Sequence, residues 1–133
     1  IEKGAVSDHI SAHYDAMATL AEIAGGAAPG ESDGISYLPT LRGGKQRAHD
    51  YLFWDYAGYG AQLAVRQGDW KAVRRGLKKN PNAPLQLYHL RKDPGESRDL
   101  AGERPEIAKR LSKIMLDARE KPEIERFRFG AYR

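Results

Sequence analysis

Gln62-Leu-Ala-Val-Arg66-Gln67-Gly68-Asp69-Trp70-Lys71-Ala-Val73-Arg74 (residues 62–74) is the stretch that decides the fold. Strand-forming residues lie on both sides of Gly68-Asp69, a two-residue connection of the kind that closes a tight β-hairpin. The pattern therefore predicts strands at Gln62–Arg66 and Trp70–Arg74, paired antiparallel. We expect Trp70 to lie in the core of the sheet.

Two further strands are predicted on either side of this hairpin. The aromatic run Tyr51–Trp54 precedes it, and the alternating run Leu85–Leu90 follows it. Between the hairpin and the last strand, Gly76–Pro84 reads as a basic loop. Asp93-Pro94-Gly95 then forms a turn, because Pro presets φ at one central position and Gly accepts a positive φ at the next. The strands together predict an antiparallel meander.

Helical periodicity flanks the strands. The first helix is predicted over residues 11–24, where Gly25-Gly26 supplies a C-terminal stop. A second runs over Pro105–Arg119, with Pro in the first helical position. A short helical turn is expected at Leu38–Leu41. The candidate caps of the first helix are Ser7, Asp8 and Ser11, and the apolar stripe of the last is Ile107, Leu111, Ile114, Met115 and Ala118.

The elements sum to an α+β fold: a sheet of about four antiparallel strands with the C-terminal helix packed across it, plus an N-terminal helix. The helix can bury its apolar stripe only against a large apolar surface, and the sheet is the one available. The tail 121–133 carries Phe127, Phe129 and Tyr132 among arginines. No pattern in the sequence places this tail.

The composition is that of a soluble globular chain. Its 133 residues, of which 41% are hydrophobic and 30% charged, suffice for one domain with a core. No run approaches the roughly 20 apolar residues of a membrane span, and no signal peptide follows Ile1. Since there is no initiator Met, we expect the chain to begin inside a longer protein or after processing. The absence of cysteine excludes disulfides, thiolate metal sites and Cys nucleophiles within these residues.

The charge balance is mildly basic. There are 22 Lys and Arg residues against 18 Asp and Glu residues, a net charge of +4. This excess suits an anionic partner without singling one out. The basic residues do not interleave with stacking aromatic residues, so we expect no nucleic acid partner.

Four stretches carry a family resemblance. Tyr14–Gly25 is similar to D-x-x-P-T-L-x-x-x-A-G, Asp33–Gly43 to D-G-x-S-L-x-P-x-L-x-G, Ala64–Val73 to A-V-R-x-G-x-W-K-x-V, and Leu87–Glu96 to L-Y-x-L-x-x-D-P-x-E. These motifs occur in this order in the C-terminal region of the formylglycine-dependent (type I) sulfatases of the alkaline-phosphatase-like superfamily. Ala18 departs from the pattern, because the family usually has Pro before the Thr.

The resemblance implies that the catalytic residues lie in another part of the parent enzyme. The family's nucleophile, formylglycine, matures from a Cys or Ser within C/S-x-P-S/T-R, and Asp and Asn side chains hold a divalent cation, usually calcium. Neither the motif nor the paired-Asp segment occurs here. We therefore expect no catalytic residue and no metal ligand in this chain, with calcium and formylglycine belonging to the parent enzyme. Residues 1–48 would be a linking segment that packs on a missing catalytic domain, and residues 49–133 the C-terminal subdomain.

Substrate contact is expected from one loop. Residues 54–62, Trp-Asp-Tyr-Ala-Gly-Tyr-Gly-Ala-Gln, combine aromatic residues, a carboxylate and glycines, as sugar-contacting loops do. In the family this region lies near the mouth of the substrate pocket. The alternative is that Trp54 packs in the sheet and the glycines only turn the chain. The candidate substrate-binding residues are Trp54, Asp55, Tyr59 and Gln62.

For the other polar residues the sequence allows a structural role as well as a functional one. Arg66 and Lys71 could contact a sulfate or carboxylate, although pairing with Asp55 or Asp69 is the commoner arrangement. His89, directly before a turn, is expected to make a structural hydrogen bond. The basic residues Arg74, Arg75, Lys78 and Lys79 are interpreted as a solvated loop or as a site for an anionic polymer. His9 and His13 lack enough further ligands nearby to hold a metal ion. Asp93, Pro94 and Glu96 are interpreted as turn and cap residues.

The sequence leaves three functions open. The first is a C-terminal part of a sulfatase that completes the substrate pocket, stabilises the catalytic domain and is inactive alone. The second is an independent module for an anionic or sulfated glycan, and the third is an oligomerisation domain. Met17, Leu20, Ile23 and Leu38 are expected to lack cover without a catalytic domain, which predicts a homo-oligomer. The resemblance implies a periplasmic or extracellular parent enzyme.

Overall fold

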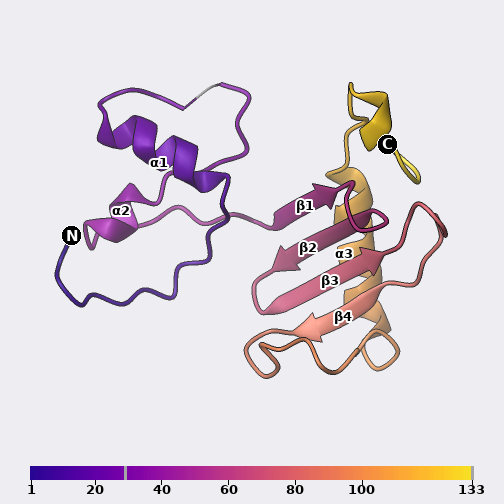
Figure 1. Cartoon of the computed structure of the whole chain (residues 1–133). Helices are drawn as coiled ribbons and strands as arrows, with labels where there is room; N and C mark the ends of the chain where they lie inside the picture. The colour runs from indigo at the N-terminus through magenta and orange to yellow at the C-terminus, as the bar shows by residue number, and fades with distance from the viewer. Residues whose placement is uncertain (29, 133) are drawn as a thin grey trace. The chain divides into compact units, whose positions relative to one another are not determined.

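The computed structural model describes residues 1–28 and 30–132 and divides the chain into two compact units, residues 1–50 and 51–133. Each unit is described by itself. The second contains a sheet whose strands follow one another in chain order, β1 to β4 (Figure 1). The strands are β1 (Leu52–Tyr56), β2 (Gln62–Gln67), β3 (Trp70–Arg75) and β4 (Gln86–His89). All three pairs are antiparallel, which confirms the predicted meander.

The hairpin at the centre of the sheet has the predicted two-residue connection. Gln67 faces Trp70 in the β2–β3 register, so Gly68 and Asp69 alone make the turn. Gly68 has a φ of +57°, a conformation that glycine adopts without the steric cost of a side chain. Trp70 packs against the core but stays partly exposed, so the expectation of a core tryptophan is only partly met.

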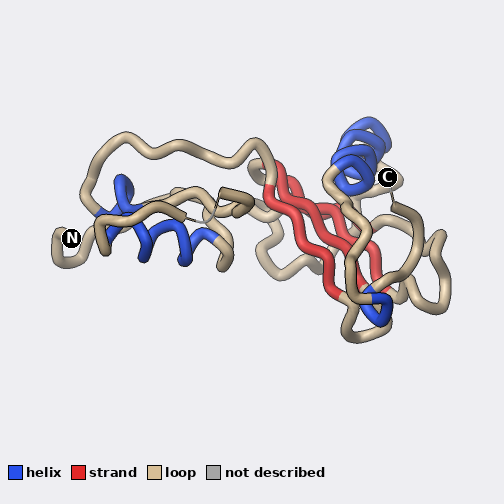
Figure 2. Tube along the Cα trace, turned by 90° about the horizontal axis from the view of Figure 1, so that it is seen from above, coloured by secondary structure: helices blue, strands red, loops and turns tan. Residues whose placement is uncertain are grey.

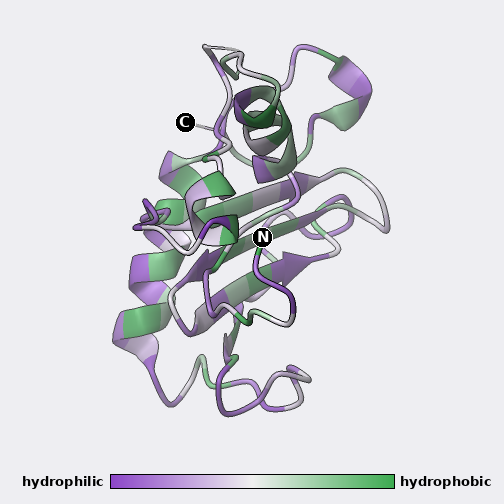
Figure 3. Ribbon diagram, turned by 90° about the vertical axis from the view of Figure 1, so that its left-hand side faces the viewer, coloured by the Kyte–Doolittle hydropathy of each residue, from purple (hydrophilic) through white to green (hydrophobic). Residues whose placement is uncertain are grey.

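The helix α3 (Pro105–Asp117) covers one face of the sheet, opposite β2 and β3 (Figure 2). Four residues of the predicted apolar stripe contact the core: Leu111 and Met115 are buried, while Ile107 and Ile114 pack at its margin. The fifth, Ala118, lies just beyond the helix, which ends two residues earlier than predicted. Polar residues occupy the rest of the helix, and the ribbons of the helices accordingly carry both hydrophobic and hydrophilic bands (Figure 3). The buried core residues are Ala61, Leu63, Val65, Ala72, Leu77, Ala83, Leu87, Leu111, Met115 and Phe129.

The tail returns to this core. After α3 a 3₁₀ turn, η1 (Glu125–Phe127), leads the chain back so that Phe129 becomes a core residue. Phe129 and Tyr132 lie on the guanidinium group of Arg119, with its central carbon 4.2 Å and 4.0 Å from the two ring centroids. Two of the three aromatic residues that the sequence could not place therefore pack on a single buried arginine, while Phe127 is exposed beside Arg126.

The first unit contains α1 (Asp15–Ile23) and α2 (Leu38–Leu41). The prediction that α1 begins near residue 11 is wrong by four residues, and none of Ser7, Asp8 and Ser11 caps it. The cause is Asp15, whose carboxylate accepts a hydrogen bond from the backbone N–H of Ala12 at 2.7 Å and so turns the chain before the helix starts.

Polar side chains on α1 join the first unit together. The Asp15 carboxylate also accepts the backbone N–H of Ile35 at 2.9 Å and contacts His49 Nε2 at 2.8 Å. One turn later, the Thr19 hydroxyl donates to the Asp15 carbonyl and accepts the backbone N–H of Tyr37. The Asp and Thr of the first family motif thus have a structural role, because they fasten residues 35–37 to the helix.

The Asp15 site predicts a pH dependence. Burial raises the pKa of the Asp15 carboxyl, but the hydrogen bonds from Ala12 and Ile35 and the contact with His49 outweigh it, so the pKa lies below its ordinary value of 3.8. The folded unit therefore favours the charged form. Its stabilising effect is complete well above pH 3.8 and is lost as the pH falls from there through the lowered pKa of the folded state.

Hydrogen exchange of residues 12–37 tests this expectation. Protection should decrease as the pH is lowered through the acid range, and Asp15→Asn should remove most of that decrease while lowering protection at neutral pH. The matched control is Asp33→Asn, in a loop of the same unit, which should leave the profile unchanged. An Asp15→Asn chain with the pH profile of the unmodified protein would contradict the assignment.

Candidate substrate-contact loop

The β1–β2 loop, residues 57–61, is held in an unusual backbone conformation. Tyr59, Gly60 and Ala61 have φ values of +46°, +79° and +68°. For residues with a side chain this left-handed conformation costs about 1–2 kcal/mol each. The loop is fixed from behind, since the carbonyl groups of Ala61 and Gly60 accept the backbone N–H groups of Leu77 and Lys78 at 3.1 Å and 3.0 Å. Local strain of this kind is often found at functional sites.

Two tyrosines form the exposed tip of the loop. Tyr59 is 88% exposed, and its ring centroid lies 6.0 Å from that of Tyr56, which is itself exposed. The Tyr56 ring lies directly over Gly58, where a Cβ atom would come within 2.5 Å of the ring. The glycine therefore makes room for the aromatic pair. Tyr56 is a candidate contact residue that the sequence interpretation missed, although the alternation of β1 places it on the same face as Trp54.

The four predicted contact residues do not all lie together. Because side chains alternate along a strand, Trp54 and Gln62 lie on one face of the sheet, near the loop tip that carries Tyr59. Asp55 lies on the opposite face, beneath α3. There its carboxylate accepts a hydrogen bond from Arg119 Nε at 2.9 Å, and its side chain is 23% exposed.

The basic strand residues have partners other than those expected. Lys71 pairs with Glu96, and Arg66 donates to the carbonyl of Gly68 at 3.0 Å. Neither the expected Asp55 nor Asp69 is their partner, since Asp69 pairs with Arg91 at 3.2 Å. The sequence could not show this, because Glu96 comes back over β3 only after the turn that follows β4.

A charged cluster therefore lies on the same sheet face as Trp54 and Gln62. Arg75 joins Lys71 at Glu96, with 3.6 Å between Arg75 Nη2 and Glu96 Oε2, and donates a hydrogen bond to Gln86 Oε1. Glu96 was expected to be a turn and cap residue only. It has a positive φ of +52° and also forms ion pairs with two strand residues.

The chain turns at Asp93 as predicted, but Glu96 rather than Gly95 has the positive φ. The carboxylate of Asp93 holds the turn. It accepts the backbone N–H groups of Arg98 and Ser97 at 2.9 Å and 2.8 Å. These bonds hold the pKa of the Asp93 carboxyl below its usual value.

His89 was expected to make a structural hydrogen bond, and the structure shows a different arrangement. Its ring meets Trp70 edge-on at 4.7 Å, and its buried Nδ1 has no hydrogen-bond partner among the described residues.

The basic loop is not one charge run. Arg74 and Arg75 are neighbours on β3 and point to opposite faces of the sheet, while Lys78 and Lys79 are exposed beyond the strand.

Among residues 1–28 and 30–132, no group of three or more His, Cys, Asp or Glu side chains is arranged to hold a metal ion. Within the same residues, no helix is long and apolar enough to cross a membrane.

Known proteins are similar to this chain in sequence and in fold. No family model matches the chain. It is 36% identical over 103 residues to the Delta 4,5-hexuronate-2-O-sulfatase of Bacteroides thetaiotaomicron, spanning 74% of this chain and 21% of that protein. It is 26% identical over 132 residues to the Ulvan-active sulfatase of Formosa agariphila, spanning 76% and 26%.

Solved structures agree with these matches. The structure of a 2-O GAG sulfatase has a TM-score of 0.63 at 32% identity, covering 75% of this chain and 22% of that one. A phosphonate monoester hydrolase of Agrobacterium radiobacter shares the fold, with a TM-score of 0.63 at 21% identity over 84% of this chain and 25% of that one. The chain spans about a fifth to a quarter of the relatives' length. The chain therefore belongs to the sulfatases of the alkaline-phosphatase-like fold and corresponds to their C-terminal region.

Proposed function

We propose that this chain is the C-terminal subdomain of a sulfuric ester hydrolase, in which it completes the substrate pocket and stabilises the catalytic domain. The observation that supports this most is the 36% identity to a sulfatase over 74% of the chain. The family's nucleophile and metal ligands would come from the remainder of the parent enzyme. By itself the subdomain would not hydrolyse a sulfate ester.

The β1–β2 loop would supply the substrate contacts. Aromatic faces and a few fixed polar groups are the usual equipment of small-molecule sites. Trp54, Tyr59 and Gln62 are the proposed direct contacts, together with Tyr56. Asp55 would contribute from the other face, because its pairing with Arg119 holds β1 beneath the loop.

The proposed substrate is a sulfated or carboxylated saccharide. The support is chemical: the sheet face that carries Trp54 and Gln62 also carries Lys71 and Arg75, two cations close to one carboxylate, Glu96. An anionic sugar would face aromatic surface at the loop and positive charge on the adjoining strand.

The catalytic domain would contact α1. Met17, Leu20 and Ile23 are 61%, 63% and 53% exposed and lie along one short helix. Leu38 was also expected to be exposed, but it is buried. Contiguous exposed apolar residues commonly mark a protein interface. In the absence of the catalytic domain we propose that the same face drives self-association of the chain.

A graft tests the loop. Residues 1–133 would replace the matched C-terminal region of the Bacteroides thetaiotaomicron sulfatase, and kcat and KM would be measured with that enzyme's own substrate. We expect Tyr59→Ala and Trp54→Ala each to raise KM about tenfold with little change in kcat, because each removes binding shared by substrate and transition state.

The control for the loop variants is Phe127→Ala, which removes an exposed aromatic side chain from η1. It should leave KM within about twofold of the unmodified graft. If the loop variants change KM no more than this control does, the loop does not contact substrate, and Trp54 is a residue of the sheet alone.

A further inference from the structure

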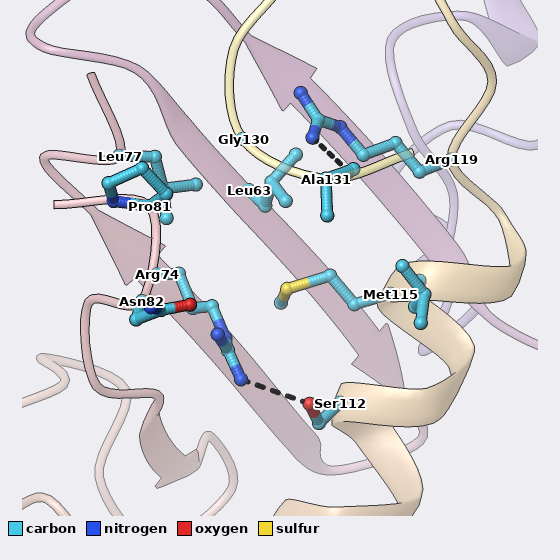
Figure 4. Close-up of a pocket in the computed structure, with 11 residues that line it drawn as sticks. Leu63, Arg74, Leu77, Pro81, Asn82, Ser112, Met115, Arg119, Gly130 and Ala131 are labelled. Atoms are coloured by element: carbon cyan, nitrogen blue, oxygen red, sulfur yellow. Dashed lines mark hydrogen bonds between the residues drawn. The ribbon is translucent and has the colours of Figure 1, made fainter. Parts of the chain in front are cut away.

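A pocket of about 220 Å³ lies between α3, the sheet and the returning tail, on the opposite side of the sheet from the candidate loop's contact face. Its walls come from β2 and β3, from the basic loop, from α3 and from Gly130 and Ala131 of the tail (Figure 4). The volume corresponds to roughly seven water molecules at about 30 Å³ each, enough for a tetrahedral oxyanion and part of the molecule that carries it.

Arg74 contributes a guanidinium group to this pocket. It lies on β3 opposite Leu63, on the face covered by α3, and its Nη2 donates to the hydroxyl of Ser112 on α3 at 3.1 Å (Figure 4). No carboxylate pairs with Arg74 in the described part of the chain. Because a guanidinium group carries five N–H donors, most of its capacity remains for a ligand.

Arg119 adds a second positive charge. Its side chain is 2% exposed, and it is held by Asp55, by the carbonyl of Ala131 and by two aromatic rings. Its Nη2 is buried with no hydrogen-bond partner among the described residues. A buried cation normally has all its donors satisfied, because an unmet buried donor destabilises the fold.

The charges around the pocket do not balance. Two guanidinium groups line it. Among the residues that the structure describes, no Asp or Glu lines it, and Asp55 is the only carboxylate paired with either arginine. A partly enclosed site with a surplus positive charge attracts an anion, and guanidinium groups are well matched to carboxylate and sulfate.

We propose that this pocket binds a small oxyanion, a carboxylate or sulfate group, with Arg74 and Ser112 as its direct partners and Arg119 as the buried charge behind them. The source could be a free ion or a group carried by a sugar. This site is separate from the β1–β2 loop, so the proposal does not depend on the proposed substrate contacts.

Titration of the whole chain followed by NMR tests the proposal. The probes are sodium sulfate, sodium acetate and a monosaccharide 6-sulfate, each at an ionic strength kept constant with sodium chloride. We expect saturable shifts of the Arg74 and Ser112 signals. Arg74→Gln should weaken binding about tenfold or more, and Ser112→Ala about threefold.

Arg110→Gln is the matched control. It makes the same charge change at an exposed arginine of α3 that does not line the pocket. It should leave binding within about twofold. If Arg74→Gln proves unfolded by circular dichroism, Ser112→Ala decides the comparison with Arg110→Gln.

Three results would overturn the proposal: no saturable shift at roughly 50 mM of any probe, equal weakening by Arg74→Gln and Arg110→Gln, or an unchanged affinity in folded Arg74→Gln. A sugar sulfate that binds about tenfold tighter than inorganic sulfate supports the site and names a sugar as the source. Equal affinities support it with a free ion as the source.

Discussion

The purified 133-residue chain is expected to hydrolyse 4-nitrophenyl sulfate no faster than buffer does. Sulfatases of this family use a formylglycine matured from a Cys or Ser within C/S-x-P-S/T-R, and the sequence contains neither that motif nor any cysteine. Enzymes accelerate their reactions by about a million-fold or more over the uncatalysed rate. Losing the nucleophile and the metal ligands together should therefore leave no measurable turnover.

A related full-length sulfatase, assayed beside the chain, provides the positive control for the assay. The chain should be produced in a host without sulfatase activity, so that a trace contaminant is not mistaken for turnover. Sulfatase activity that follows the chain through successive purification steps at constant specific activity would contradict this expectation. Such a result would mean that residues 1–133 hold a complete active site.

Arg119→Ala is expected to destabilise the second unit by about 3 kcal/mol, near the lower end of the range for removing one partner of a buried ion pair. Arg119 is almost fully buried, and its loss leaves Asp55 without its cation. The substitution also removes the surface on which Phe129 and Tyr132 lie. The tail should therefore detach, and chemical denaturation with hydrogen exchange of residues 128–132 measures both effects.

The control is Arg110→Ala, at an exposed arginine of α3, the helix that ends two residues before Arg119; it should change stability by no more than about 0.5 kcal/mol. Arg119→Lys should lie between the two, because Lys keeps the charge but cannot reproduce the planar fork of the guanidinium group. Equal stability of the Arg119→Ala and Arg110→Ala chains would show that Arg119 does not fasten the tail.

The sequence predicted the sheet well because its signals are local. Each strand carries its own alternation, and Gly68-Asp69 leaves room for only one connection between the central pair. The register then follows from the turn, since a two-residue link fixes which residues face each other. The stripe on α3 was equally readable, because burial of Leu111 and Met115 requires only helical spacing.

Two of the failures are caused by contacts between residues far apart in the sequence. The start of α1 depends on an Asp15 carboxylate that also reaches Ile35 and His49, which no local window contains. Arg119 reads in the sequence as the polar end of an amphipathic helix, yet it is buried against Asp55, 64 residues away. No local pattern predicts that pairing. The position of Asp55 is a different case: strand alternation alone puts it on the opposite face from Trp54, and the sequence interpretation did not apply that alternation to the candidate site.

The most direct measurement of the central claim is the sulfatase activity of the graft. The Bacteroides thetaiotaomicron sulfatase would be assayed in three forms: intact, with its C-terminal region removed, and with that region replaced by residues 1–133. If the chain serves as a sulfatase C-terminal subdomain, the graft should recover kcat/KM to within about a hundredfold of the intact enzyme, while the shortened form should have none above background. A folded, soluble graft as inactive as the shortened form would contradict the account.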